Sequence, residues 1–333
     1  MSEIRIGLIG GGWMGKAHTT AFHNAKMIFG DDMPVFEIVS DVTEDAAKAF
    51  AEQMGYVRYT ADWHDVVSDP AVDLVDVATP NCMHYEMAKA ALEHGKHLLV
   101  EKSITLNSRE LDEMMQLAEQ NHLILAEAMT IWHMPLYKKL WDMLRGGEFG
   151  KVQMITVNFG SFKEYNMENR FFNLNLAGGA MLDIGVYALS VVRSFMDEQP
   201  NQIISQWKPS PTGSDEQATI LLQNPSGQMA TVALSMHSKQ PKRAMISCET
   251  GYLEIMEFPR ADRAVFVDAE TGKRTEITCG ESKQALYYEM TDMEDAVQNA
   301  DASAMQLPYS KDVMDIMTKL RKDWKMQYPE EQW

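Results

Sequence analysis

The sequence is poor in the residues from which disulfide frameworks and metal sites are built. It has 3 cysteines among 333 residues, Cys82, Cys248 and Cys279, which are widely separated and odd in number. This usage favours reduced thiols, so we expect a cytoplasmic protein. The 9 histidines and the cysteines form no Cys-x-x-Cys or His-Glu-x-x-His pattern, so we expect no metal site. A Gly-x-Ser-x-Gly nucleophile motif is also absent, which excludes one class of hydrolase.

Basic residues and long apolar runs are also scarce. The chain has 30 Lys and Arg against 48 Asp and Glu, a formal net charge of −18. That balance argues against nucleic acid and anionic membranes as partners. No run of about 18 apolar residues occurs, and the N-terminus lacks a basic segment followed by an apolar one, so we expect no membrane span and no secretory signal. The length is sufficient for two domains.

The most informative segment is glycine-rich and lies near the N-terminus. An apolar strand pattern over residues 4–9 runs directly into residues 10–15, Gly-Gly-Gly-Trp-Met-Gly, and a helix pattern follows to about residue 29. In this order the first glycine permits a tight turn, the third lets the backbone approach a pyrophosphate, and the last lets the helix pack on the strand. The pattern is weak by itself but much stronger between a strand and a helix. It predicts a dinucleotide site formed by Gly10, Gly12, Trp13, Met14 and Gly15.

The strand and helix patterns divide the chain into two parts. Through the first third they alternate, with later strands expected at 35–41, 57–59, 74–78, 97–100 and 123–126, and this alternation predicts a parallel sheet. From residue 152 longer strands with alternating apolar residues follow one another, interrupted by a helix over about 180–196 and followed by helices over 286–300 and 310–326. We therefore expect an α/β protein with a Rossmann dinucleotide-binding domain over 1–126. A substrate-binding and oligomerisation α/β domain with a large, mostly antiparallel open sheet should occupy 127–333.

Two partners follow from this organisation. The large open sheet would leave one face uncovered in a monomer, so we expect a homodimer or homotetramer that buries it. Asp41 ends the second strand, where a carboxylate can accept hydrogen bonds from the adenosine ribose and repel a 2′-phosphate. This favours NAD over NADP as cofactor, although Asp41 also fits a solvated acid at a strand end.

Further polar residues lie where ligands bind parallel sheets, beyond the carboxyl ends of the strands. Thr79 and Asn81 follow the fourth strand pattern, and Asn81 equally fits an N-cap of the next helix. His84 lies in the first turn of that helix, where capping or a structural role explains it better than catalysis. Glu101 and Lys102 end the next strand; a lysine there could hydrogen-bond a reacting hydroxyl, or simply point to water.

A second glycine pair precedes another candidate group. Residues 178–187 read Gly-Gly-Ala-Met-Leu-Asp-Ile-Gly-Val-Tyr, so Asp183 and Tyr187 are spaced i, i+4 and share one face of a helix. A free tyrosine has a pKa of about 10 and needs a nearby cation such as Lys102 to act as a base near neutral pH. The spacing by itself is better explained by a helix-start aspartate and a core tyrosine.

Taken together, these motifs resemble the glucose–fructose oxidoreductase / inositol dehydrogenase / MocA (Gfo/Idh/MocA) family over nearly the whole chain. The resemblance rests on residues 10–15, 78–81 with His84, 95–102 and 177–187. It implies a Rossmann domain followed by an α/β domain with a large open sheet, and oxidation or reduction of hydroxyls in sugars, polyols and related diols with NAD or NADP. It implies that Lys102 contacts substrate and nicotinamide, that Asp183 positions the substrate, and that Tyr187 is the acid/base. With the glycine segment and Asp41, the residues assigned to the cofactor are Thr79, Asn81, His84, Glu101 and Lys102.

The chain departs from the family pattern in ways that concern the substrate. Ser103 replaces the usual proline after Glu-Lys. Tyr187 stands where many members have histidine. The tyrosine form resembles the branch that contains glucose–fructose oxidoreductase, dimeric dihydrodiol dehydrogenases and some xylose dehydrogenases. No arginine precedes Pro135, so Trp132 or His133 is expected to line the substrate pocket instead.

Weaker pocket candidates and two alternative functions stay open. Arg170 and Asn173, just upstream of the second glycine pair, fit a pocket and an exposed polar surface about equally well. One alternative is an enzyme of the same fold that uses bound NAD for glycoside cleavage without net redox change. The other is a non-catalytic dinucleotide-sensing protein.

Overall fold

The computed structural model describes residues 3–29 and 33–331 and divides into two compact units. The first comprises Met1–Met129 and Gln284–Leu307, and the second Thr130–Lys283 and Pro308–Trp333. The boundary near residue 129 lies close to the one expected at 126/127. Residues 284–307 belong to the first unit, whereas the division based on the sequence placed them in the second domain.

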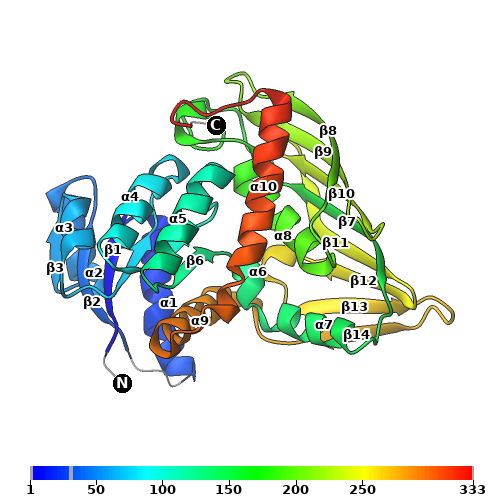
Figure 1. The fold of residues 1–333 in the computed structure, drawn as a ribbon, viewed down its shortest axis with the longest axis horizontal. Coiled ribbons are helices and arrows are strands. Elements are labelled where there is room, and N and C mark those ends of the chain that lie inside the picture. Colours follow the sequence, from blue (N-terminus) through cyan, green and yellow to red (C-terminus); the bar gives the residue numbers. More distant parts are fainter. Residues whose placement is uncertain (1–2, 30–32, 332–333) are drawn as a thin grey trace. The chain divides into compact units, whose positions relative to one another are not determined.

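The first unit is built on a parallel sheet (Figure 1). Its strands are β1 (Arg5–Ile9), β2 (Val35–Ser40), β3 (Arg58–Thr60), β4 (Leu74–Val77), β5 (His97–Glu101) and β6 (Leu125–Ala128). They lie in the order β3-β2-β1-β4-β5-β6, and the pairs between them are parallel. This is the strand order of a Rossmann dinucleotide-binding fold, in which the chain reverses direction next to β1.

Helices connect these strands by right-handed crossovers, so the helices before and after the reversal cover opposite faces. The helices are α1 (Trp13–Phe29), α2 (Glu44–Met54), α3 (Trp63–Ser68), α4 (Asn81–Glu93) and α5 (Ser108–Gln120). The core against α1 and α2 includes Phe22, Phe36 and Phe50, which are nearly fully buried. Local sequence fixes both ends of α2. Thr43 caps its start through the side-chain hydroxyl, and Gly55 ends it at φ 86°.

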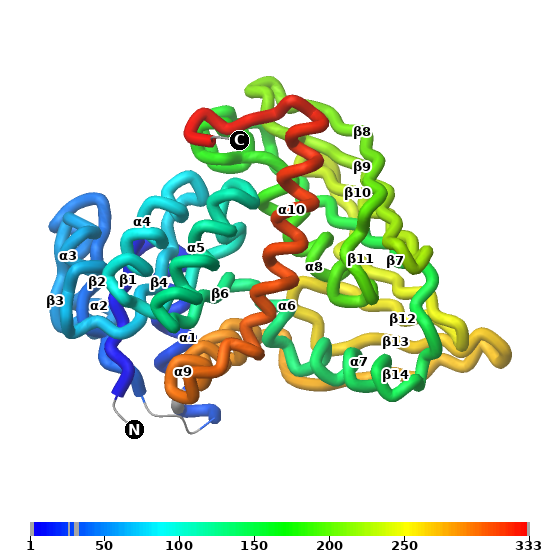
Figure 2. Tube along the Cα trace, viewed as in Figure 1, coloured from blue at the N-terminus to red at the C-terminus, as the bar shows by residue number. Residues whose placement is uncertain are grey.

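Helix α9 (Ala285–Asn299) completes the same face. Its Met290 and Met293 are fully buried in the core cluster that contains Phe22 of α1. Figure 2 shows α9 beside α1, and the two helices contact one another. The helix therefore belongs to the first unit, because its apolar side chains share the core of α1, whereas the sequence pattern placed it in the second domain.

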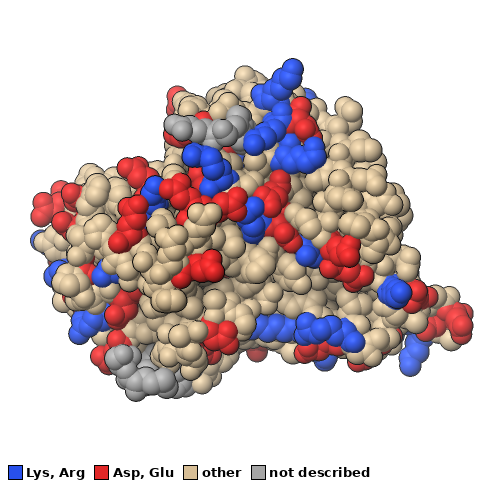
Figure 3. All heavy atoms as spheres, viewed as in Figure 1, with Lys and Arg blue, Asp and Glu red and all other residues tan. Residues whose placement is uncertain are grey.

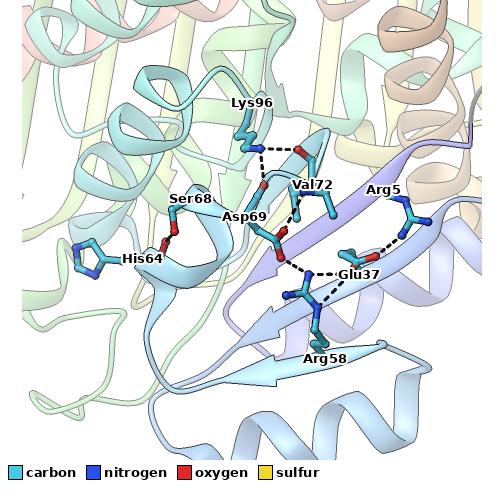
Figure 4. A network of polar contacts seen from close by, with 9 residues as sticks. Arg5, Glu37, Arg58, His64, Ser68, Asp69, Val72 and Lys96 are labelled. Carbon is cyan, nitrogen blue, oxygen red and sulfur yellow. Dashed lines mark hydrogen bonds and ion pairs between the residues drawn. The ribbon is translucent and has the colours of Figure 1, made fainter.

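A polar network ties the amino ends of the parallel strands together (Figure 4). Glu37 of β2 pairs with both Arg5 of β1 and Arg58 of β3, and Arg58 also pairs with Asp69. Lys96, just before β5, is buried and donates from Nζ to the main-chain carbonyl of Asp69 at 2.6 Å. These contacts satisfy charged groups at the edge of the sheet opposite the glycine-rich turn, and we interpret them as structural.

The second unit is built on a larger sheet. Its strands are β7 (Val152–Gly160), β8 (Gln202–Pro209), β9 (Asp215–Gln223), β10 (Met229–Ser235), β11 (Gln240–Cys248), β12 (Gly251–Met256), β13 (Arg263–Asp268) and β14 (Arg274–Thr278). Their order is β14-β13-β12-β11-β7-β10-β9-β8, and among the described residues only the β7–β10 pair is parallel. The mostly antiparallel open sheet is therefore confirmed, with β8 and β14 as strands that the sequence pattern did not reveal.

Helices pack on one face of this sheet. They are α6 (Thr130–His133), α7 (Pro135–Arg145), α8 (Val186–Phe195) and α10 (Leu307–Trp324), the last of which starts at the boundary between the units. The helical segment Leu174–Phe195 is long and apolar enough in composition to cross a membrane, but 78% of its apolar window is buried inside the structure. That burial is typical of the central helix of a folded domain. On the face in Figure 3, acidic and basic side chains are interspersed.

Candidate active site

The turn after β1 shows why glycine stands at three of its positions. Gly10 adopts φ 101°, and a Cβ there would lie 2.8 Å from the carbonyl oxygen of Ala78. A Cβ on Gly15 would lie 2.1 Å from the carbonyl oxygen of Gly10, so α1 can approach the turn this closely only without a side chain. Gly12 differs, because a Cβ there would meet nothing within 4 Å. Packing of the protein therefore explains Gly10 and Gly15, and open space remains in front of Gly12.

The first turn of α1 adjoins this open space. Trp13 and Met14 begin the helix directly after Gly12, and the Trp13 side chain is 76% exposed. The backbone N–H groups of a first helical turn have no partners within the helix and attract anions. The segment fits the pyrophosphate of a dinucleotide.

Asp41 lies beside the same turn. It follows β2, and a Cβ on Gly11 would lie 2.8 Å from its Oδ2 atom. Its Oδ1 atom accepts the backbone N–H of Val42 at 2.6 Å. The fold thus brings the carboxylate to the edge of the glycine turn, although 26 residues separate Asp41 from Gly15. This fits a contact with the adenosine ribose.

The residues after β4 are close to the turn as well. Helix α4 begins at Asn81, and Pro80 occupies its N-cap position without a side-chain hydrogen bond, so Asn81 does not serve as the cap. His84 is fully buried, with its ring nitrogens 2.8 Å from the carbonyl oxygen of Thr79 and 2.9 Å from that of Ser103. Burial lowers the pKa of His84 below its usual value. His84 joins two loops, the structural role that its position in the sequence favoured.

Glu101 ends β5 at the same edge of the sheet, and Lys102 follows it directly. Glu101 is buried, and its Oε2 atom accepts the backbone N–H of Lys102 at 3.0 Å. Lys102 is half-buried, and the peptide bond that follows it, to Ser103, is cis. The cofactor-side residues from the sequence thus gather at the carboxyl ends of β1, β2, β4 and β5.

The second unit holds the other candidate group, Asp183 and Tyr187, and the glycine pair Gly178 and Gly179 precedes the helix that carries it. A Cβ on Gly178 would lie 2.6 Å from the carbonyl oxygen of Arg170, and one on Gly179 would lie 2.0 Å from Oδ1 of Asp215. Gly179 also adopts φ 136°. Two close approaches and a left-handed conformation therefore require glycine here, just before the helix that carries Asp183 and Tyr187.

The helix begins with a π-helical turn over Met181–Gly185 and continues as α8. Asp183 lies in the π-turn, is 16% exposed, and accepts a hydrogen bond from the Arg170 guanidinium at 3.2 Å. Tyr187 lies in the first turn of α8, half-buried, with its ring 6.5 Å from that of Phe159. Single π-turns occur often at functional sites. Arg170 is thus brought to Asp183, which makes it the best supported of the weaker pocket candidates.

The expected pocket-lining residues of α6 are both buried. Trp132 is fully buried, donates from Nε1 to Ser310 Oγ at 3.3 Å, and packs against Trp141 and Tyr309. His133 is equally buried at 1% exposure. Both rings are therefore part of the helix packing of the second unit. The side chain of Asn173 accepts the backbone N–H of Asn175 and so stabilises its own loop.

Three residues of these two groups were missed by sequence reasoning. His18 and Asp76 lie behind Lys102, and Asp215 lies behind the glycine pair. The first two place a charge in an otherwise apolar setting: His18 precedes Ala21, Phe22 and Ala25 on the inner face of α1, and Asp76 interrupts the apolar strand β4. Such breaks in an apolar pattern were the available signal. Asp215 begins β9 among polar residues and gave no such signal. In the described part of the chain no cluster of three or more His, Cys, Asp or Glu side chains suits a metal ion.

Comparison with known proteins gives matches in both units. Residues 4–129 match the NAD-binding Rossmann fold of an oxidoreductase family, Gfo/Idh/MocA, and residues 137–254 match the C-terminal domain of the same family. The chain is 26% identical to scyllo-inositol 2-dehydrogenase (NADP(+)) of Bacillus subtilis over 345 residues, covering 99% of both proteins. It is 28% identical to levoglucosan dehydrogenase of Pseudarthrobacter phenanthrenivorans over 219 residues, which is 63% of this chain and 56% of that protein.

A solved structure extends the likeness to the whole fold. Levoglucosan dehydrogenase in complex with NADH and levoglucosan superposes with a TM-score of 0.89 at 20% identity, covering 98% of this chain and 100% of the other. At that identity the likeness establishes the fold.

Proposed function

The chain belongs to the Gfo/Idh/MocA oxidoreductase family, and we propose that it transfers a hydride between a nicotinamide cofactor and a hydroxyl-bearing carbon of a sugar, polyol or related diol. The observation that carries the proposal is the presence of Lys102, Asp183 and Tyr187 together in a member of this family. The open space at Gly12 supports the cofactor part of it. The named relatives, a levoglucosan dehydrogenase and an inositol dehydrogenase, support the substrate class.

Each of the three side chains has a distinct role in the oxidative direction. The bound nicotinamide supplies the hydride acceptor. Tyr187, as a tyrosinate favoured by the positive charge of Lys102, takes the proton of the substrate hydroxyl at its phenolate oxygen and becomes the neutral phenol. Lys102 hydrogen-bonds to that hydroxyl, and its positive charge favours loss of the proton. Asp183 accepts hydrogen bonds from the substrate and so orients it.

We further propose that the cofactor is NAD. Asp41 stands beside the glycine turn, where its carboxylate can accept the ribose hydroxyls and repel a 2′-phosphate. The exposed side chain that follows it, Val42, offers no positive charge to such a phosphate. Relatives of both kinds exist, one named for NADP(+) and one bound to NADH, so the proposed preference rests on Asp41 and Val42 of this chain.

The test is turnover of a panel of polyols and aldoses with NAD and with NADP, followed by nicotinamide absorbance. Lys102→Met and Tyr187→Phe should lower turnover by about 100-fold or more, because each removes a group that assists proton transfer. NADH should still bind to both variants, as measured by its fluorescence. The efficiency kcat/KM with NAD should exceed that with NADP by at least about tenfold.

Full activity in either variant would overturn the assignment of roles. Release of free sugar without accumulation of NADH would favour glycoside cleavage. Tight NADH binding without turnover of any substrate would favour the sensing function.

The second unit also supports a proposal about assembly. Four apolar side chains are exposed on the sheet face that α8 does not cover: Ile204 at 66%, Leu221 at 43%, Met229 at 41% and Met154 at 44%. Strand register makes them neighbours, because Leu221 pairs with Ile204 and Met229 pairs with Met154. We propose that a second copy of the chain covers this face and forms a homodimer or homotetramer. Light scattering at micromolar concentration tests it.

The proposed location is the cytoplasm. Cys82, Cys248 and Cys279 form no disulfide in the described structure, and burial raises the pKa of the Cys248 thiol to about 11. A thiol of that kind stays protonated and resists oxidation. Fractionation of cells that produce the protein would test the location.

A further inference from the structure

A buried charged cluster lies behind Lys102 in the first unit. His18, on the inner face of α1, is fully buried, and its Nδ1 atom is 3.0 Å and 3.1 Å from the two carboxylate oxygens of Asp76. Its Nε2 atom is 3.0 Å from Oε1 of Glu101. Asp76 comes from β4 and Glu101 from β5, so one imidazole ring joins α1 to two neighbouring strands.

The geometry fixes the charge of this ring. Both ring nitrogens face carboxylate oxygens, and a histidine donates from both nitrogens only as an imidazolium. Burial opposes that charge, but the carboxylates of Asp76 and Glu101 outweigh burial and hold the pKa of His18 well above its ordinary value. In turn, burial would raise the pKa of Glu101, but hydrogen bonding and charge from His18 lower it. The cluster is thus an imidazolium held between the side chains of Asp76 and Glu101, with little access to water.

The array reaches Lys102 through the other oxygen of Glu101. Oε1 of Glu101 meets His18, while Oε2 accepts the backbone N–H of Lys102 at 3.0 Å. The residue after Lys102 is held as well, because the carbonyl oxygen of Ser103 meets the buried ring of His84 at 2.9 Å. The backbone before Lys102 is therefore held by His18 through Glu101, and the backbone after it is held by His84.

We propose that His18 is a positioning residue for Lys102. Through Glu101 it holds the backbone from which the lysine side chain extends, and it ties that backbone to the helix that starts at the glycine turn. The distance between a dinucleotide bound at the glycine turn and the amine of Lys102 after β5 is then kept constant. This rests on the proposed role of Lys102 in the reaction and adds a residue that does not itself touch substrate.

The first test is His18→Gln, with His23→Gln as a matched control. His23 lies on the same helix, half-buried, but its ring meets a different partner: its Nε2 atom is 3.1 Å from the carbonyl oxygen of Met54. His18→Gln should lower kcat by about 10- to 100-fold, the cost of a displacement on the scale of an ångström. The dissociation constant of NADH, read from its fluorescence, should change by less than about threefold, and His23→Gln should leave both values unchanged.

A second readout needs neither substrate nor cofactor. The rate at which acetic anhydride acylates Lys102, relative to the exposed lysines of the same chain, reports the surroundings of the amine. His18→Gln and the isosteric Glu101→Gln should each change this relative rate several-fold. Because the two residues act as one unit, the double variant should be no more affected than the more impaired single variant.

The outcomes separate this inference from the proposed function. An unchanged acylation rate of Lys102 together with an unchanged kcat in both variants would overturn the positioning role, even if Lys102→Met is inactive. A lower melting temperature with both readouts unchanged would do the same, because it would make the cluster merely structural. Should His18→Gln fail to fold, Glu101→Gln carries the test, since it preserves shape and removes one charge. An active Lys102→Met variant would instead refute the proposed function, and the acylation result would still stand.

Discussion

At the scale of single residues, the three glycines of the first turn have unequal reasons to be glycine. Gly15 is required by the protein itself, because its Cβ would overlap the carbonyl oxygen of Gly10 at 2.1 Å. Gly12 is not, since its Cβ would meet nothing within 4 Å. A requirement at Gly12 must therefore come from a ligand.

This difference gives a prediction about two alanine variants. Gly15→Ala should destabilise the first unit by roughly 1–3 kcal/mol or more, because the added methyl group forces the backbone apart. Gly12→Ala should leave the melting temperature within about a degree of the parent and weaken NADH binding by about tenfold or more, because the methyl group occupies the space of the pyrophosphate. Thermal unfolding and NADH fluorescence on the same preparations measure both effects. Equal loss of stability in the two variants would show that open space at Gly12 does not mark a ligand site.

At the scale of elements, the start of the helix that carries Asp183 is held by a buried carboxylate. Oδ2 of Asp215 accepts the backbone N–H of Met181 at 2.6 Å, and its Oδ1 atom has no hydrogen-bond partner among the described residues. The buried guanidinium of Arg321 is attracted to Asp215 but is paired with Glu331. Burial raises the pKa of Asp215 to about 7, despite the opposing effects of the hydrogen bond and of Arg321.

A raised pKa makes this carboxyl a source of pH-dependent stability. The folded state holds the proton up to about pH 7, whereas an unfolded aspartate releases it near pH 3.9. Between these values the folded chain binds more protons than the unfolded chain, so the contribution of Asp215 to the free energy of unfolding falls as pH rises. The shift sets a ceiling on the order of 4 kcal/mol for this loss.

Asp215→Asn should therefore become more stable relative to the parent as pH rises. The amide keeps an oxygen for the Met181 N–H and removes the charge. The difference in melting temperature between variant and parent should grow by several degrees from pH 5 to pH 8. Asp197→Asn, at an exposed aspartate, serves as the control and should show a constant difference. A constant difference for Asp215→Asn as well would mean that the buried carboxyl does not titrate in this range.

The elements also show what sequence patterns can and cannot predict. Strand–helix alternation with glycine at β1 gave the Rossmann unit, because apolar period and turn residues are local signals. The exposed edge strand β8 was missed because its outward apolar residues, such as Ile204, break the expected alternation with the core. The π-turn over Met181–Gly185 was missed because the glycine pair before it fits against Asp215, which is distant in sequence.

The same distinction between local and non-local signals applies to the residues of the candidate site. Residues at strand ends, such as Asp41 and Lys102, could be predicted to lie at one edge of the sheet, because parallel topology places all carboxyl ends there. The packing of Trp132 could not be predicted, since nothing in an aromatic residue near a proline distinguishes a pocket wall from helix packing. His18 was overlooked because its partners, Asp76 and Glu101, come from strands that only the fold brings to it.

At the scale of the whole molecule, one face of the second sheet exposes apolar side chains that a single chain does not cover. Alternation along β9 buries Ile220 and Leu222 against the helices and leaves Leu221 on the open side. The register places Leu221 between Ile204 of β8 and Thr231 of β10, so it lies within the apolar part of that face. A second copy packed on it by a two-fold axis would bring equivalent side chains toward each other.

Leu221→Lys should therefore prevent the assembly without disturbing the fold. In a two-fold interface the substitution buries two like charges near the axis, which costs far more than the lost apolar contact. The parent should scatter light as a dimer or tetramer of the 37.7 kDa chain, and the variant should move toward the mass of one chain. Val42→Lys, at an 87% exposed apolar residue of the first unit, should leave the mass unchanged. A parent of monomer mass would refute the assembly, whereas a variant that still assembles would place the interface on another surface, because a lysine at the centre of this face could not be accommodated.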